Sequence, residues 1–208
     1  MSKTRLGFLA SYRGSNMQVI LDACSRGELD AEAVLVISNN RDSGALARAA
    51  SAGVPTLHLS SQTHPEPGLL DSAMVAALRD SAVDLVVLAG YMKKLGPGML
   101  QAFRGRILNI HPSLLPRHGG RGMYGRYVHE AVIRAGERES GVTVHLVEDE
   151  YDSGPILAQR SVSVDPHDDA DSLAGKILAV EHEIYVDTLA RIINGEIRLP
   201  GVGKLSAR

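Results

Sequence analysis

Short apolar runs alternate with helix-like segments along the first half of the chain, and this alternation restricts the fold more than any other feature. Strand-like runs lie at 5–10, 33–38, 54–59, 84–89 and 107–110, with helical periodicity between them at 15–25, 43–52, 69–80 and 96–103. Parallel strands need crossover helices between them, and these crossovers are right-handed. The run 84–89, DLVVLA, is apolar throughout, as expected for a strand buried on both faces. The pattern predicts an α/β protein with one Rossmann-like domain, a mostly parallel central sheet and helices on both faces.

The second half of the chain predicts a different pairing of strands. A loop at 112–122 and a helix at 124–135 precede two alternating runs, 141–147 and 156–164, which are joined by an acidic turn. Two such runs are typical of an antiparallel hairpin. A long helix is expected over 168–193. We therefore expect an antiparallel strand pair toward the C-terminus, a folded domain over residues 1–195 and a C-terminal tail over 196–208.

Composition and charge exclude several classes of protein. The 208 residues suit one domain, and 22 Lys and Arg against 24 Asp and Glu give a net charge of −2, which lacks the basic excess of a general nucleic-acid binder. No run of 18 apolar residues and no signal-peptide core is present, so we expect no membrane partner. Cys24 is the only cysteine, which excludes an intrachain disulfide and fits a reducing, cytoplasmic location.

The turn after the first strand, S-Y-R-G-S-N, has the composition of a phosphate-binding turn. Backbone N–H groups at a helix N-terminus attract anions, and Gly14 permits close approach of a ligand. Ser15 and Asn16 are expected to cap the helix and to donate hydrogen bonds. Neither G-x-G-x-x-G nor G-x-x-x-x-G-K-[S/T] is present, so a single phosphate on a small substrate is favoured over NAD or ATP. A purely structural turn remains the alternative.

Asn109 and His111 lie at the carboxyl end of the fifth strand, in ILNIHPSLLP. Ligands of open parallel sheets bind at this edge, and residues i and i+2 of a strand face the same side. An imidazole beside a carboxamide suits acyl-type transfer, because both groups donate to a developing oxyanion. His145 is read as a structural strand residue.

Asp152 lies in the acidic turn E-D-E-Y-D-S-G-P with Glu148, Asp149 and Glu150. Such a cluster either binds a cation or is a solvated turn. Gly154 and the proline after it are expected to hold Asp152 more firmly than the other acids. A carboxylate set against an imidazole favours the charged ring, so we expect Asp152 to raise the pKa of His111.

Two strings at these residues carry a family resemblance. LNIHPSLLP and YDSGPILAQ resemble the folate-dependent formyltransferases, and SYRGSNMQ, LAGYMKKL and EHEIY are similar to the branch that formylates 5'-phosphoribosylglycinamide (GAR) in purine synthesis. The resemblance spans about residues 5–195. It implies direct formyl transfer from the co-substrate 10-formyltetrahydrofolate to the amine of GAR, without a metal, by a monomer or homodimer.

The resemblance also assigns roles to residues of this chain. It implies a catalytic trio of Asn109, His111 and Asp152. Substrate contacts are implied for Gly14, Ser15 and Asn16 at the phosphate and Glu181 at the ribose. Folate contacts are implied for Met92, Lys93, Lys94, Leu95, Asn109, Glu148, Asp149, Glu150 and Tyr151.

The chain departs from this family at two places, and other functions compete. Many relatives carry an arginine near Pro67, and Leu178 stands where relatives often have a polar residue, which leaves Lys176 as a substitute near the phosphate.

A formyltetrahydrofolate hydrolase is one competing function, but it usually adds a regulatory domain and reads His-His-Ser where this chain reads His-Pro-Ser. A methionyl-tRNA formyltransferase needs a further RNA-binding domain. A phosphate-binding module without catalysis is the alternative outside the enzymes.

Overall fold

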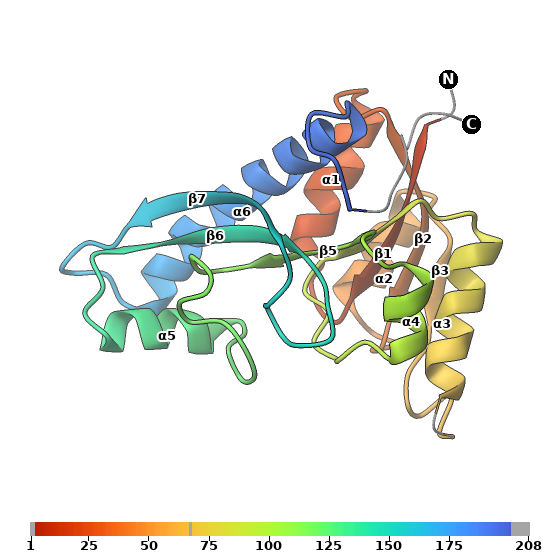
Figure 1. The fold of residues 1–208 in the computed structure, drawn as a ribbon, viewed down its shortest axis with the longest axis horizontal. Helices are drawn as coiled ribbons and strands as arrows, with labels where there is room; N and C mark the ends of the chain where they lie inside the picture. Colours follow the sequence, from red (N-terminus) through yellow and green to blue (C-terminus); the bar gives the residue numbers. More distant parts are fainter. Residues whose placement is uncertain (1–2, 67, 201–208) are drawn as a thin grey trace.

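The computed structural model describes residues 3–66 and 68–200, which form one α/β domain around a seven-stranded sheet of order β3-β2-β1-β4-β5-β6-β7 (Figure 1). In chain order the elements are β1 (Thr4–Ala10), α1 (Ser15–Ser25), β2 (Ala31–Ser38), α2 (Gly44–Ser51), β3 (Thr56–His58), α3 (Leu69–Asp80), β4 (Leu85–Leu88), α4 (Pro97–Ala102), β5 (Ile107–His111), α5 (Arg126–Arg134), β6 (Glu139–Leu146), β7 (Ile156–Ser163) and α6 (Ala170–Ile193).

The direction of the strands confirms the predicted topology. Strands β1 to β5 pair in parallel, whereas β6 runs antiparallel to both β5 and β7. The sequence order reverses where β1 lies between β2 and β4, which opens a crevice at the carboxyl ends of the strands. The loops after β1, β4 and β5 all leave from this edge.

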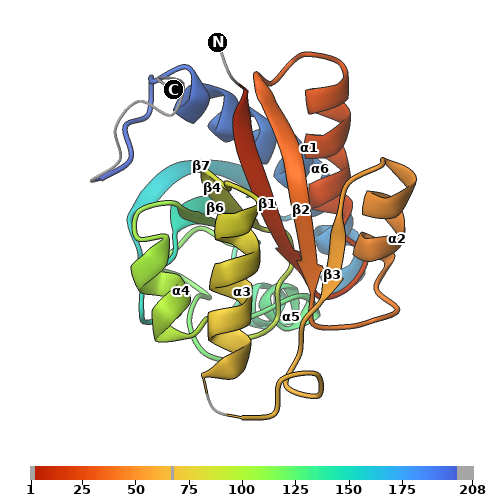
Figure 2. The same cartoon turned by 90° about the vertical axis from the view of Figure 1, so that its right-hand side faces the viewer.

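Each strand sends alternate side chains to two cores, one on each face of the sheet. In β4, Leu85 and Val87 join the core beneath α1 and α6, while Val86 and Leu88 join the core beneath α3 and α4. Figure 2 shows α3 and α4 on one side of the sheet and α1 and α2 on the other. In β5, Leu108 and Ile110 face α6 and its neighbours, so Asn109 and His111 face the opposite side.

The bounds of the elements differ from the sequence prediction at a few ends. The predicted helix from 124 begins instead at Arg126, because Gly125 adopts φ 52° and ψ −132°, which no α-helix contains. The third strand is shortened to three residues, since it pairs only with β2. Ser43 caps α2 as expected, accepting from Leu46 N at 3.3 Å.

The C-terminal segment continues from α6 onto the domain. Leu199 is 6% exposed, and Ile197 packs against the core that contains α1 and α6. Residues 201–208 of the expected tail, and Pro67, lie outside the described residues. Within 3–66 and 68–200, no helix has the length and apolar character needed to cross a membrane.

Candidate active site

A cavity of about 390 Å³ opens at the carboxyl edge of β4 and β5. Its walls are the segment after β4, the loop after β6, the end of β5 and residues 120–125. Every residue that the resemblance assigns to folate lines it: Met92, Lys93, Lys94, Leu95, Asn109, Glu148, Asp149, Glu150 and Tyr151. Lys94 and Tyr151 link the two walls, because the Lys94 ammonium lies 5.6 Å from the centre of the Tyr151 ring. His111 and Asp152 also line the cavity.

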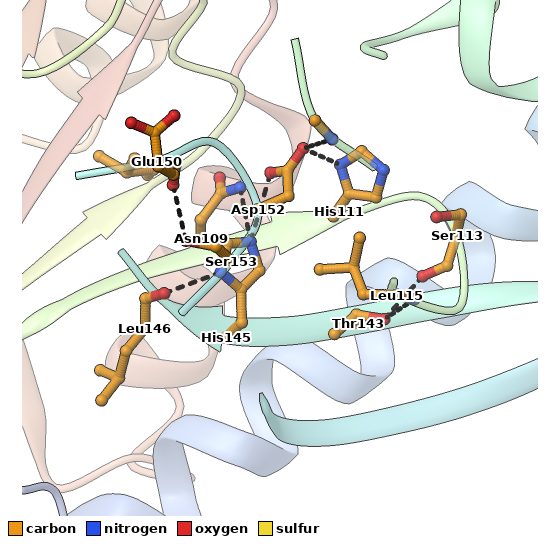
Figure 3. A network of polar contacts seen from close by, with 12 residues as sticks. Asn109, His111, Ser113, Leu115, Thr143, His145, Leu146, Glu150, Asp152 and Ser153 are labelled. Carbon is orange, nitrogen blue, oxygen red and sulfur yellow. Dashed lines mark hydrogen bonds and ion pairs between the residues drawn. The ribbon is translucent and has the colours of Figure 1, made fainter. Parts of the chain in front are cut away.

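The register of β5 against β6 assembles the floor of this cavity. Asn109 is paired with His145, and His111 with Thr143. Directly opposed residues on antiparallel strands lie close enough for their side chains to interact. The structure therefore brings together the three residues expected from the sequence, Asn109, His111 and Asp152, and adds His145 to them (Figure 3).

His111 is 3% exposed, and both of its ring nitrogens face oxygen atoms of the chain. Its Nε2 lies 2.8 Å from the carbonyl oxygen of His118, and its Nδ1 lies 3.5 Å from Asp152 Oδ2. A carbonyl oxygen only accepts hydrogen bonds, so Nε2 carries a proton. The Nδ1 side of the ring therefore faces the Asp152 carboxylate.

Asp152 differs from the other acids of its turn in both exposure and conformation. Glu148, Asp149 and Glu150 are exposed, whereas Asp152 is half-buried and accepts a hydrogen bond from Gly120 N at 2.8 Å. Its φ of 55° lies in the left-handed region that non-glycine residues rarely occupy. The surrounding structure therefore holds this carboxylate toward His111.

Two observations concern the acidic turn, which was expected either to bind a cation or to be solvated, with Gly154 helping to hold Asp152. A Cβ on Gly154 would collide with the carbonyl oxygen of Leu146, so the chain approaches β6 this closely only with glycine at that position. Among the described residues, no group of three or more His, Cys, Asp and Glu side chains is arranged to hold a metal ion.

His145 was expected to be a structural strand residue, and it is buried in β6, where it also contacts Asn109. The ring is 2% exposed, its Nδ1 lies 2.8 Å from the carbonyl oxygen of Leu146, and burial lowers its pKa. The neutral ring therefore donates from Nδ1 and accepts at Nε2, where Asn109 Nδ2 lies at 3.1 Å. The cross-strand register is the signal that identifies this residue, and the register becomes available only with the fold.

A buried polar clamp fixes the loop after β5. Thr143 Oγ1 donates to the carbonyl oxygen of Ser113 at 2.7 Å and accepts from Leu115 N at 3.1 Å. Gln159 on β7 donates from Nε2 to Thr143 Oγ1 and to the Leu115 carbonyl, both at 2.9 Å. This loop continues to His118, so the clamp supports the carbonyl that orients His111.

Residues 11–16, which lead from β1 into the start of α1, were expected to bind phosphate and are called the phosphate-side turn. This turn has the predicted glycine backbone but not the predicted capping. Gly14 is the N-cap of α1 with φ 68°, and no side chain of residues 3–66 and 68–200 caps the helix, so the expectation that Ser15 and Asn16 do so is wrong. A Cβ on Gly14 would lie 2.8 Å from Ala45 Cβ. Glycine is required here both for its φ and for the packing of α2 against the turn.

Asn16 instead turns toward α6. Its Nδ2 donates to Glu181 Oε2 at 2.9 Å, and its Oδ1 is buried without a partner among the described residues. Both residues are 9% exposed, and burial raises the pKa of Glu181 to about 7. Two residues assigned to substrate binding, 165 positions apart in sequence, thus form one buried pair.

The Lys176 ammonium is paired with carboxylates and is therefore not free to bind a phosphate at the phosphate-side turn. Its ammonium pairs with Asp165 and, at 2.6 Å, with Asp168. Leu178 is 39% exposed. Lys176 therefore enters any phosphate site only by leaving two carboxylates.

With this geometry established, comparison with known proteins defines the class of protein. Residues 4–189 match the family model described as formyl transferase, and the chain belongs to this family. Within it, the chain belongs with the phosphoribosylglycinamide formyltransferases, and it is a transferase.

Three relatives support this placement. The chain is 42% identical to the chloroplastic phosphoribosylglycinamide formyltransferase of Arabidopsis thaliana, over 94% of this chain and 68% of that protein. It is 39% identical to the enzyme of Haemophilus influenzae, over 94% of this chain and 90% of that protein. The crystal structure of glycinamide ribonucleotide transformylase 1 from Symbiobacterium toebii superposes with a TM-score of 0.89 at 38% identity, over 96% and 92% of the two chains.

Proposed function

We propose that this protein transfers the formyl group of 10-formyltetrahydrofolate to the amine of GAR in purine biosynthesis. The observation that carries the proposal is the meeting of Asn109, His111 and Asp152 on the floor of a cavity whose walls are the two folate-side segments. The phosphate-side turn leaves β1 at the same edge of the sheet, separated from β5 only by β4. A substrate anchored at that turn reaches the cavity floor along this edge.

The proposed reaction is a direct attack without a covalent enzyme intermediate. The nitrogen of the amine forms a bond to the formyl carbon, and the carbonyl oxygen becomes an oxyanion. The bond from that carbon to the folate nitrogen then breaks, and the proton lost by the attacking nitrogen ends on the leaving nitrogen. None of these steps requires a metal.

Two groups of the chain are placed to stabilise the oxyanion. One N–H of the Asn109 amide is directed to His145, which leaves the second N–H for the substrate. His111 is held at Nε2 by the His118 carbonyl, so Nδ1–H is the ring donor that remains for the reaction. The 3.5 Å separation of Nδ1 from Asp152 is too long for a full hydrogen bond, which leaves this proton for an arriving oxyanion.

Asp152 has two proposed roles. Its carboxylate stabilises the positive charge of His111, because opposite charges at this separation attract strongly away from bulk water. It also accepts the proton of the attacking nitrogen, directly or through water, and passes it to the leaving nitrogen.

Absorbance of the folate during turnover tests the proposal. A transferase converts 10-formyltetrahydrofolate to tetrahydrofolate only when GAR is present, and it does so equally after exhaustive chelation of metals. Conversion without GAR would identify a hydrolase. No conversion with both compounds present would reduce the protein to a binding module and overturn the proposal.

A further inference from the structure

Asp71 and the start of α4 form a contact that the proposed mechanism does not use. Helix α4 has six residues, begins with Pro97 and has no side-chain cap from its own N-cap residue. Asp71, in the first turn of α3, accepts from Gly98 N through Oδ2 at 2.6 Å and from Met99 N through Oδ1 at 3.0 Å. One carboxylate from a neighbouring helix thus satisfies two N–H groups that a short helix leaves free.

Glycines on both sides make room for this carboxylate. A Cβ on Gly96 would collide with the carboxyl group of Asp71, and a Cβ on Gly98 would lie 2.6 Å from Oδ2. Neither glycine has the positive φ that would require glycine for conformational reasons. Close approach of Asp71 is therefore the structural reason for glycine at both positions.

The segment that Asp71 anchors is one wall of the cavity. Residues 89–96 connect β4 to α4, and six of them, 90–95, line the cavity together with Leu100 of α4. The other end of the wall is also fixed, because Met92 N donates to Ser11 Oγ at 2.8 Å. Ser11 is 2% exposed and donates onward to Asn39 Oδ1 at 2.6 Å. The wall is thus attached at both ends, at the half-buried Asp71 and at the buried Ser11.

We propose that Asp71 is a positioning residue for the formyl donor. It touches no reacting atom. It holds the start of α4, and α4 holds residues 92–95 against the donor that the cavity binds. The inference rests on the proposed function, since it assigns this cavity to the donor. The GAR side of the site is built on α1 and α6, which Asp71 does not contact, so the two substrates respond differently to its loss.

Steady-state kinetics with each substrate varied in turn test this inference. Asp71→Asn leaves one acceptor oxygen for two N–H groups. Loss of one hydrogen bond to a charged group typically changes an equilibrium constant about tenfold. We expect KM for 10-formyltetrahydrofolate to rise about tenfold, KM for GAR to stay within twofold, and kcat to fall less than KM rises. The matched control is Asp80→Asn, at the exposed last residue of the same helix, which should change neither constant.

A second variant tests the contact from the other side. Gly98→Ala replaces a helical glycine and would ordinarily favour the helix. Here its Cβ displaces the carboxylate, so the same selective rise in KM for the donor is expected. Gly175→Ala in α6, where a Cβ meets nothing within 4 Å, is the control. Because both changes break one contact, the double variant Asp71→Asn with Gly98→Ala should be no worse than the more affected single variant.

Each outcome decides between explanations. Equal rises in KM for both substrates, or additive effects in the double variant, would show that Asp71 only stabilises the fold and would overturn the inference. If Asp71→Asn does not fold, Gly98→Ala alone decides by the same selectivity. A wild-type protein that fails to formylate GAR would instead overturn the proposed function, so the two failures are distinguishable.

Discussion

At the β5 end of the site, the ring nitrogens of His111 and His145 and the carboxylate of Asp152 all face polar partners supplied by the chain. At the β1 end, Asn16 Oδ1 is buried without a partner among the described residues, and burial raises the pKa of the Glu181 carboxyl to about 7. Buried polar groups without partners cost free energy. The polar groups at the β5 end therefore have partners within the chain, whereas Asn16 Oδ1 at the β1 end is an acceptor that a ligand can satisfy.

This difference fits separate roles for the two ends. The proposed catalytic groups are preorganised, so that their hydrogen bonds need little rearrangement when charge develops on the substrate. Asn16 and Glu181, which are proposed to bind the substrate, keep an unused acceptor and a carboxyl whose pKa is raised to about 7. Binding of a hydroxyl-rich substrate there would relieve a cost that the free protein carries.

Removal of either oxyanion donor tests the preorganised end most severely. Asn109→Ala and His111→Ala should each lower kcat by about 10²–10³, because loss of one oxyanion donor typically has this effect. His64→Ala, in the loop before α3, serves as a control for loss of an imidazole away from the site. Circular dichroism should confirm that each variant folds, and near-wild-type kcat in both site variants would contradict the assignment of the donors.

The four acids of the loop after β6 provide an internal comparison. Asp152→Asn keeps an acceptor for Gly120 N but removes the charge facing His111, and we expect kcat to fall by about 10², the lower end of what loss of one general acid–base group typically costs. Asp149→Asn, at an exposed residue of the same loop that the resemblance assigns to folate contact, should leave kcat within twofold and act on KM for the folate instead. Equal losses in the two variants would mean that the loop contributes only overall charge.

Glu181→Gln tests the β1 end, where the substrate is proposed to supply the missing hydrogen-bond partner. Because the pKa of Glu181 is raised from 4.5 to about 7, stability that is fully present below pH 4.5 is lost as pH rises through 7. The glutamine variant lacks this loss, so urea unfolding at pH 8.5 should show it to be more stable than wild type by about 3 kcal/mol, since each pKa unit corresponds to about 1.4 kcal/mol.

The same variant should raise KM for GAR and leave KM for the folate unchanged. At pH 4.5, where Glu181 carries a proton in the folded protein, the stability difference from wild type should vanish. A constant difference at both pH values would show that Glu181 does not titrate in its buried setting.

The preorganised end has the opposite dependence on pH. Burial lowers the pKa of His145, so the ring stays neutral in the folded protein, and its contribution to stability is lost as pH falls below about 6.5. His145→Gln removes this titration. Its unfolding free energy should fall less than that of wild type between pH 7 and pH 5, and an unchanged slope would place the titration elsewhere.

Local patterns of residue types predicted much of the fold and part of the site. Apolar continuity identified β4, alternation identified β6 and β7, and strand-end position placed Asn109 and His111 on one face, all of which the structure confirms. The resemblance selected the residues that line the cavity. The proximity of Asp152 to His111 required the fold, because a left-handed φ at Asp152 is not encoded by any local pattern of residue types.

The features that the sequence did not reveal depend on register or on main-chain atoms. His145 reads as one more polar position in an alternating strand until β6 is aligned with β5. The carbonyl of His118 carries no side-chain signal at all, yet it fixes the proton on His111 Nε2. Asp71 looks like an ordinary first-turn acid of α3, and its partner is the start of a different helix.

Tyr185 bears on the order in which the working enzyme forms during synthesis. Its side chain is fully buried, and its hydroxyl donates to the carbonyl oxygens of Leu88 on β4 and Leu108 on β5. Glu181 lies one turn earlier on the same helix. Strands β4 and β5, at whose carboxyl ends the cavity opens, are thus tied together by α6, which follows both of them in the chain. A nascent chain that lacks α6 contains Asn109 and His111 on β5, but it has neither the hydroxyl of Tyr185 across β4 and β5 nor the partner of Asn16. The buried pair of Asn16 and Glu181 therefore forms only after α6 has been synthesised.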